Sequence, residues 1–127
     1  GATKLVSIEV RGARTARDAA RCARRIANSP LVKTAFFGND PNVGRILMAA
    51  GSSSADVASD RLVLWIGGVK VAAQGRLLTE ALGAAGAAMR EREFTVSLDL
   101  RLGRATARIL TCDLSYDYVR INAEYTT

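Results

Sequence analysis

The stretch Phe94–Leu100, FTVSLDL, carries the most regular pattern of this sequence and decides its fold class. Apolar Phe, Val and Leu alternate with Thr, Ser and Asp, which is the period of a half-buried β-strand. Leu102 and Gly103 then indicate a turn, and residues 104–112 read as a second strand that returns from it. We therefore expect a sheet with one face in a core.

Four more strand patterns precede this pair. Residues from Val6 to Val10 alternate in the same way, and the apolar residues 62–66 and 69–71 flank Gly67-Gly68. Two glycines at this spacing predict a tight hairpin with positive φ at both turn positions. Pro30 introduces the apolar run Leu31–Phe37, for which we expect a strand that is packed on both faces or covered by a partner.

Helical patterns lie between these strands. Thr15, with an acid three residues later, resembles a capping box, and apolar residues at helical spacing continue to about Asn28. A second helix is expected to be capped by Asp40, to carry Pro41 in its first position and to end at Gly51.

Residues 79–90 predict a third helix. The mixture of strands and helices indicates one α/β (α+β) domain over residues 1–127, a length that suits a single core.

The composition narrows the possible functions. Lys and Arg number 18 against 12 Asp and Glu, yet aromatic residues are few and do not interleave with the basic ones. A solvated cationic face is therefore favoured over nucleic-acid binding. Apolar runs stay well below the ~18 residues of a membrane span, and no leader pattern opens the chain, so we expect a cytoplasmic protein without membrane contact.

The residue types limit the chemistry further. The chain contains no His, which excludes an imidazole base, and Cys22 and Cys112 lie far apart in the sequence. We therefore expect no metal site and no cofactor, and interpret both cysteines as small core residues in a reducing compartment. The serines 52–54 read as a loop, and the acidic pair Asp56 and Asp60 as a solvated surface.

Two segments suggest binding. Gly38–Arg45, GNDPNVGR, surrounds an expected helix start, where free amides could bind an anion, although capping and turn formation explain the same residues. The carboxyl end is unusually rich in Tyr, Val and Ile, which indicates a docked tail. Such a tail either only packs or presents Asn122, Thr127 and the terminal carboxylate to a zwitterionic small molecule.

Three stretches resemble one family: Gly1–Lys4, Asn28–Ile46 and Asp117–Thr127. They are similar to the later part of the β chain of ornithine acetyltransferases, the glutamate N-acetyltransferases of the arginine pathway. Val43 departs from this pattern, since family members commonly carry Trp there.

The resemblance implies a precursor that cuts itself before a threonine whose α-amino group acts as its own base. This threonine takes acetyl from N-acetylornithine and passes it to glutamate. Thr3 is not that nucleophile, because Lys4 follows it where the family has an apolar pair. The nucleophile is therefore expected upstream of this chain, so that no catalytic residue lies within it.

Carried over residue by residue, the family's substrate contacts fall on Asn122 and Thr127. The implied architecture is the layered αββα sandwich of self-processing aminopeptidases. The implied partners are the α chain and the upstream part of the β chain, in an α2β2 heterotetramer. Alternative readings are a hydrolase of the related group and a non-catalytic amino-acid-binding module.

Overall fold

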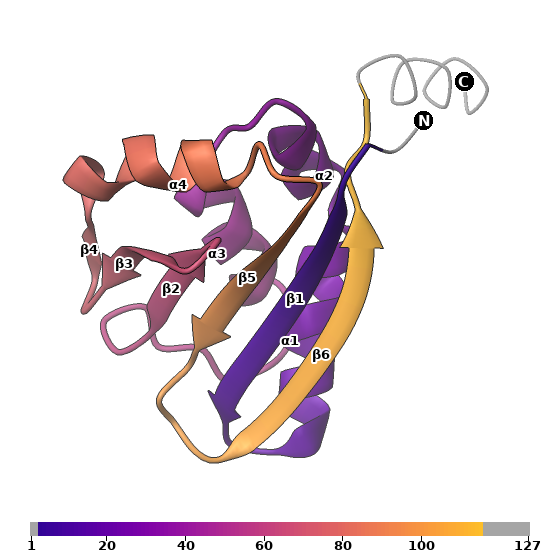
Figure 1. Cartoon of the computed structure of the whole chain (residues 1–127). Coiled ribbons are helices and arrows are strands. Elements are labelled where there is room, and N and C mark those ends of the chain that lie inside the picture. The colour runs from indigo at the N-terminus through magenta and orange to yellow at the C-terminus, as the bar shows by residue number, and fades with distance from the viewer. Residues whose placement is uncertain (1–2, 116–127) are drawn as a thin grey trace.

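The computed structural model describes residues 3–115, which form one six-stranded sheet with helices α1, α2 and α3 on one of its faces (Figure 1). The strand order is β4-β3-β2-β5-β1-β6; β1 and β5 run parallel, and the other neighbours run antiparallel. The α/β class is confirmed. The elements are β1 (Leu5–Ala13), α1 (Ala16–Asn28), α2 (Pro30–Phe37), α3 (Val43–Gly51), β2 (Val63–Ile66), β3 (Val69–Ala73), β4 (Arg76–Leu77), a 3-10 turn (Thr79–Ala81), α4 (Leu82–Ala88), β5 (Glu93–Asp99) and β6 (Ala105–Cys112).

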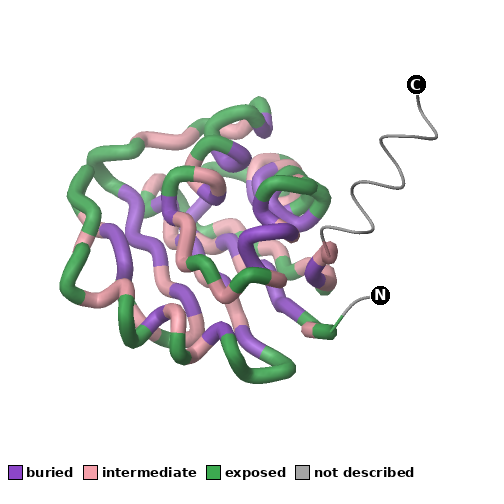
Figure 2. The backbone as a smooth tube through the Cα atoms, turned by 90° about the horizontal axis from the view of Figure 1, so that it is seen from above, coloured by how far each residue is buried: buried purple, intermediate pink, exposed green. Residues whose placement is uncertain are grey.

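Strand β1 lies between β5 and β6 and organises the core. Its Val6, Ile8 and Val10 are fully buried, and α1 packs over β1 and β6. The alternate residues of β5 are buried in the same way, as the period of two predicted. Buried segments therefore gather between the sheet and the helices, and exposed residues lie in the turns and loops and on the outer sides of the helices and edge strands (Figure 2).

The predicted hairpin is confirmed. Ile66 pairs with Val69 across the turn, and Gly67 and Gly68 have φ of 58° and 81°. The cap of α1 is confirmed as well, because the Thr15 hydroxyl accepts a hydrogen bond of 3.0 Å from the Asp18 N–H. The third helix is confirmed from Leu82 to Ala88, preceded by the 3-10 turn.

The predicted strand over Leu31–Phe37 is wrong, because these residues form helix α2. Ser29 caps the helix by accepting a hydrogen bond from the Val32 N–H, and Pro30 occupies its first turn, where a missing N–H costs nothing. Val32, Ala35 and Phe36 are buried, which is the i, i+3, i+4 spacing of one helical face. An apolar run of this length does not distinguish strand from helix, and the cap decides it.

The second face of the sheet is not covered by any helix among the described residues (Figure 1). Apart from the buried Ser7, the side chains that neighbouring strands place on it are partly or largely exposed, because residues between the buried ones point to the other side. We call this surface the open face; its central members are Ser7, Glu9 and Arg11 of β1, Trp65 of β2, Thr95, Ser97 and Asp99 of β5, and Arg108 and Leu110 of β6.

The two turn glycines provide a matched test of how the hairpin meets α4. Both have positive φ, so alanine costs about 1–2 kcal/mol at either position. A methyl group at Gly67 would in addition lie 2.5 Å from Ala88 Cβ, whereas nothing lies within 4 Å of one at Gly68. We expect Gly67→Ala to lower the free energy of unfolding by about 1–3 kcal/mol more than Gly68→Ala in urea denaturation. Equal losses would show that the hairpin does not pack on α4.

Candidate functional site

A single carboxylate ties the start of β1 to the end of β6. Asp113 Oδ1 accepts hydrogen bonds from the Thr3 N–H at 2.7 Å and the Lys4 N–H at 3.0 Å, and Oδ2 accepts one from the Thr3 hydroxyl at 2.5 Å. Asp113 is only 1% exposed. We call this arrangement the Asp113 clasp.

Hydrogen bonding keeps this buried carboxylate charged. Burial by itself would raise the pKa of Asp113, but the hydrogen bonds from Thr3 and Lys4 outweigh that effect and hold the pKa below its ordinary 3.8. Asp113 is therefore ionised at neutral pH, and its two oxygens accept the three donors as charge-assisted hydrogen bonds.

Lys4 links the clasp to the GNDPNVGR segment by hydrogen bonds of its side chain. The Lys4 ammonium donates to the Phe36 carbonyl oxygen at 2.5 Å and to the side-chain oxygen of Asn39. Burial lowers the pKa of Lys4, and the nearby Asp113 carboxylate opposes this shift. Asn39 has a φ of 54°, a conformation that asparagine tolerates better than most residues. Lys4 thus connects β1 to the loop after α2.

The GNDPNVGR segment is a capped turn. Asn42 is the cap of α3, because its side-chain oxygen accepts a hydrogen bond from the Arg45 N–H at 3.1 Å. The predicted cap at Asp40 and helix start at Pro41 are therefore wrong by two residues. Asp40 instead accepts a bond from the Asn42 amide, which orders the turn in front of the helix.

The alternative of an anion site in this segment gains no support. The N–H groups of Asn39, Asp40, Asn42 and Val43 already donate to backbone oxygens. The Arg45 guanidinium donates to the Leu31 carbonyl oxygen at 3.0 Å and so holds α3 against α2. The structure therefore supports the interpretation as a turn and a cap.

A hollow of about 560 Å³ lies beside the clasp. It is lined by Thr3, Lys4, Leu5, Arg92, Glu93 and Cys112. Thr3 and Lys4 belong to both the hollow and the clasp, and Cys112 directly precedes Asp113. Its wall offers charges of both signs, which suits a ligand that carries an ammonium and a carboxylate.

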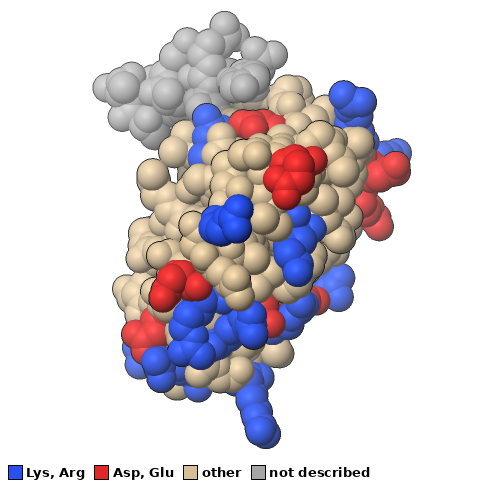
Figure 3. All heavy atoms as spheres, turned by 90° about the vertical axis from the view of Figure 1, so that its left-hand side faces the viewer, with Lys and Arg blue, Asp and Glu red and all other residues tan. Residues whose placement is uncertain are grey.

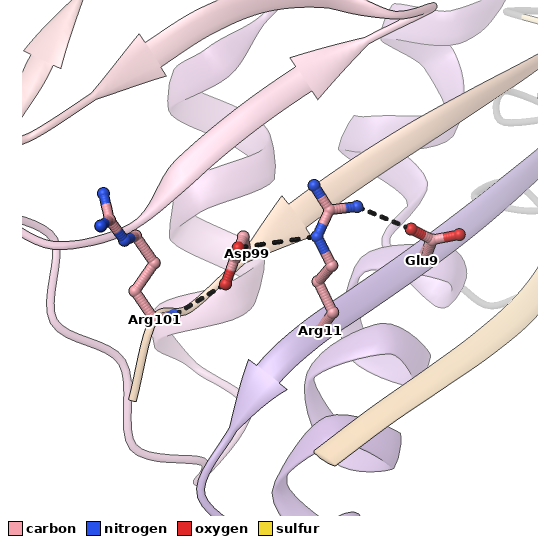
Figure 4. Close-up of polar contacts among 4 residues, drawn as sticks. All are labelled: Glu9, Arg11, Asp99 and Arg101. Atoms are coloured by element: carbon pink, nitrogen blue, oxygen red, sulfur yellow. Dashed lines mark hydrogen bonds and ion pairs between the residues drawn. The ribbon is translucent and has the colours of Figure 1, made fainter. Parts of the chain in front are cut away.

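A charged network on the open face joins β1 to the end of β5 (Figure 4). Arg11 forms ion pairs with Glu9 at 2.9 Å and Asp99 at 3.6 Å, and its guanidinium lies 4.8 Å from the centre of the Trp65 ring. Asp99 also accepts a hydrogen bond from the Arg101 N–H. These charges are paired within the sheet, so a surface that packs on them would not meet isolated ions.

The remaining chemical candidates have structural roles. Ser52 and Ser53 donate to backbone oxygens at the end of α3, and Asp56 pairs with Arg14 at 3.2 Å. Cys22 is buried as expected, and burial raises the pKa of its thiol to about 11. Cys112 is half-buried and lines the hollow, so the expectation of a core residue is wrong there.

On the face that Figure 3 shows, acidic side chains lie among the basic ones. Among residues 3–115, no group of acidic or Cys side chains could hold a metal ion, and no helix there is long and apolar enough to cross a membrane. Asn122 and Thr127, the predicted substrate contacts, lie outside the described residues.

The described residues form a mixed six-stranded sheet with helices on one face, which is an α/β fold. Comparison with known proteins gives the family. The model of the ArgJ family matches residues 1–127, and the chain is 51% identical to the arginine biosynthesis bifunctional protein ArgJ of Geobacter sulfurreducens and 46% identical to the glutamate N-acetyltransferase of Methanosarcina mazei. This chain belongs to the ArgJ family.

Both relatives are longer than this chain. The alignments cover 100% of it and 33% of each relative, so the chain spans about a third of their length. A crystal structure of the arginine biosynthesis bifunctional protein ArgJ from Bacillus halodurans superimposes with a TM-score of 0.90 at 40% identity, over 98% of this chain and 59% of that one. The fold of this chain is therefore shared with that ArgJ protein.

Proposed function

We propose that this chain is part of an enzyme that moves an acetyl group from N-acetylornithine to glutamate. The observation that carries the proposal is the family match over residues 1–127, with relatives named for arginine biosynthesis and for glutamate N-acetyltransferase. The resemblance implies a nucleophilic threonine upstream of residue 1, and this chain spans about a third of the relatives' length.

The proposed reaction has two steps on a threonine outside this chain. The threonine hydroxyl attacks the acetyl carbonyl of N-acetylornithine, its proton passes through the threonine's own α-amino group to the departing amine, and ornithine leaves. The amine of glutamate then attacks the resulting ester, and the hydroxyl is regenerated. Covalent catalysis of this kind replaces one high barrier by two lower ones.

In this proposal the present chain binds and aligns the amino acids. Asn122 and Thr127 contact the substrate through an amide and a hydroxyl. The hollow beside the clasp adds Arg92 and Glu93, charges that suit the carboxylate and ammonium groups of an amino acid.

The open face supports a layered assembly with companion segments. Leu5 and Leu110 are 43% and 60% exposed on this side of the sheet. Trp65 and Thr95, which alternate with buried residues along β2 and β5, lie on the same side. A second sheet packed here would bury these side chains and complete an αββα sandwich. We assign this sheet to the α chain and the upstream part of the β chain, in an α2β2 heterotetramer located in the cytoplasm.

Acetyl transfer measured against hydrolysis tests the proposed function. The assembled protein, with the segments that the longer relatives carry, should form N-acetylglutamate from N-acetylornithine and glutamate. Without glutamate, release of free acetate should be slow. Rapid acetate release that glutamate does not suppress would instead identify a hydrolase. No turnover of N-acetylornithine in either assay would reject the enzyme and favour an amino-acid-binding module.

The carboxyl-terminal residue provides a matched test of the predicted substrate contact. Thr127→Val removes the hydroxyl and keeps the shape, so KM for the amino-acid substrates should rise about tenfold, as expected for one lost hydrogen bond. Thr127→Ser keeps the hydroxyl and should leave KM near that of the unaltered protein. The same KM for both variants would remove Thr127 from the site.

A further inference from the structure

The Asp113 clasp joins segments that are 110 residues apart in the sequence. An apolar contact could join the two segments without burying a charge, whereas a carboxylate that is 1% exposed is tolerated only while its oxygens stay hydrogen-bonded. All three donors come from Thr3 and Lys4, two of them from backbone N–H groups. A small displacement of this segment would leave a buried oxygen of Asp113 unsatisfied, so the clasp sets the position of the segment narrowly.

The clasp lies within a wider network that fixes three parts of the fold together. Lys4 donates to Phe36 and Asn39 at the end of α2, and the Leu114 N–H donates to the Lys33 carbonyl oxygen at 3.1 Å. The start of β1, the end of α2 and the residues after β6 therefore keep one arrangement. Each of these links is long-range, and each lies at the end of the sheet that carries the hollow.

The hollow depends on the same residues. Thr3 and Lys4 form part of its wall, and Cys112, on the wall as well, directly precedes Asp113. Leu5, the next residue on the wall, is held by its N–H, which donates to the Arg92 carbonyl oxygen at 2.8 Å. Release of Thr3 from Asp113 would therefore move the wall of the hollow while the core of the sheet stays packed.

We propose that Asp113 is a positioning residue for the amino-acid substrates: through Thr3 and Lys4 it holds the wall of the hollow in its binding shape. This inference rests on the proposed acetyl transfer and deepens it. Asp113 does not touch the reacting atoms. It accepts three hydrogen bonds and keeps the residues that line the hollow in register, so its loss weakens substrate binding more than it slows the chemical steps.

The test uses the assembled protein and compares Thr3→Val with Thr3→Ser. Valine removes the hydroxyl that Asp113 Oδ2 accepts and keeps the side-chain shape, whereas serine keeps the hydroxyl. We expect Thr3→Val to raise KM for N-acetylornithine and glutamate about tenfold with kcat changed less than about threefold. Thr3→Ser should restore KM.

Substitution of the carboxylate extends the test. Asp113→Asn keeps an oxygen for the two backbone N–H groups, and its amide can donate to the Thr3 hydroxyl, so the protein should assemble with a smaller rise in KM. Combining it with Thr3→Val leaves that amide without its partner, and KM should rise more than for either single variant.

The outcomes separate this inference from the proposed function. Absence of acetyl transfer in the unaltered protein would overturn the proposed function, and this inference with it. Normal transfer by the unaltered protein, together with unchanged KM in Thr3→Val and in the double variant, would overturn the positioning role alone. A lowered melting temperature at unchanged KM would have the same meaning, because it shows that the clasp stabilises the fold and does not shape the hollow.

Discussion

The structure depends on the position of β1 between β5 and β6. One row of its side chains, Val6, Ile8 and Val10, is fully buried under α1, and this burial fixes the helix layer on one side. Because side chains of a strand alternate between faces, the same register places Ser7, Glu9 and Arg11 on the open face. The register of β1 with its neighbours therefore determines both which side chains enter the hydrophobic core and which are available to a companion sheet.

The pairing of β1 with β6 also positions the candidate site, which lies where β1 begins and β6 ends. Leu5 pairs with Cys112, and the next residues meet in the clasp between Thr3, Lys4 and Asp113. Toward the other end of β1, the charged network joins β1 to β5, because Arg11 forms ion pairs with Glu9 on its own strand and with Asp99 on β5. The charged side chains Glu9, Arg11 and Asp99 on the open face are thus paired with one another, and Leu5 and Leu110 leave apolar surface exposed on the same face.

Much of the fold could be predicted from local patterns. Strands β5 and β6, the Gly67-Gly68 hairpin and the Thr15 cap follow from periods and turn residues within a few positions of one another. Helix α2 was missed because a short apolar run has no period that separates it from a strand, although Ser29 and Pro30 carried the helical signal. The cap of α3 was misplaced because Asp40 and Asn42 are both good capping residues, and the backbone turn selects between them.

The candidate site was less predictable, for a different reason. Asp113 and Thr3 meet across 110 residues, and no local pattern indicates which of twelve acidic residues accepts the Thr3 and Lys4 donors. Asn122 and Thr127 came from family resemblance, and they stay predictions because they lie outside the described residues.

In the assembled, active protein, a companion sheet should cover the open face. Thiol labelling of a cysteine introduced at each of two positions in the assembled protein tests this most directly, in a Cys112→Ser background where the remaining Cys22 is buried. Leu110 on the open face and Met48 on the helix layer are 60% and 71% exposed in this chain. The account predicts rapid labelling of Met48→Cys and protection of Leu110→Cys until the assembly is unfolded. Equal labelling rates in the native assembly would contradict it.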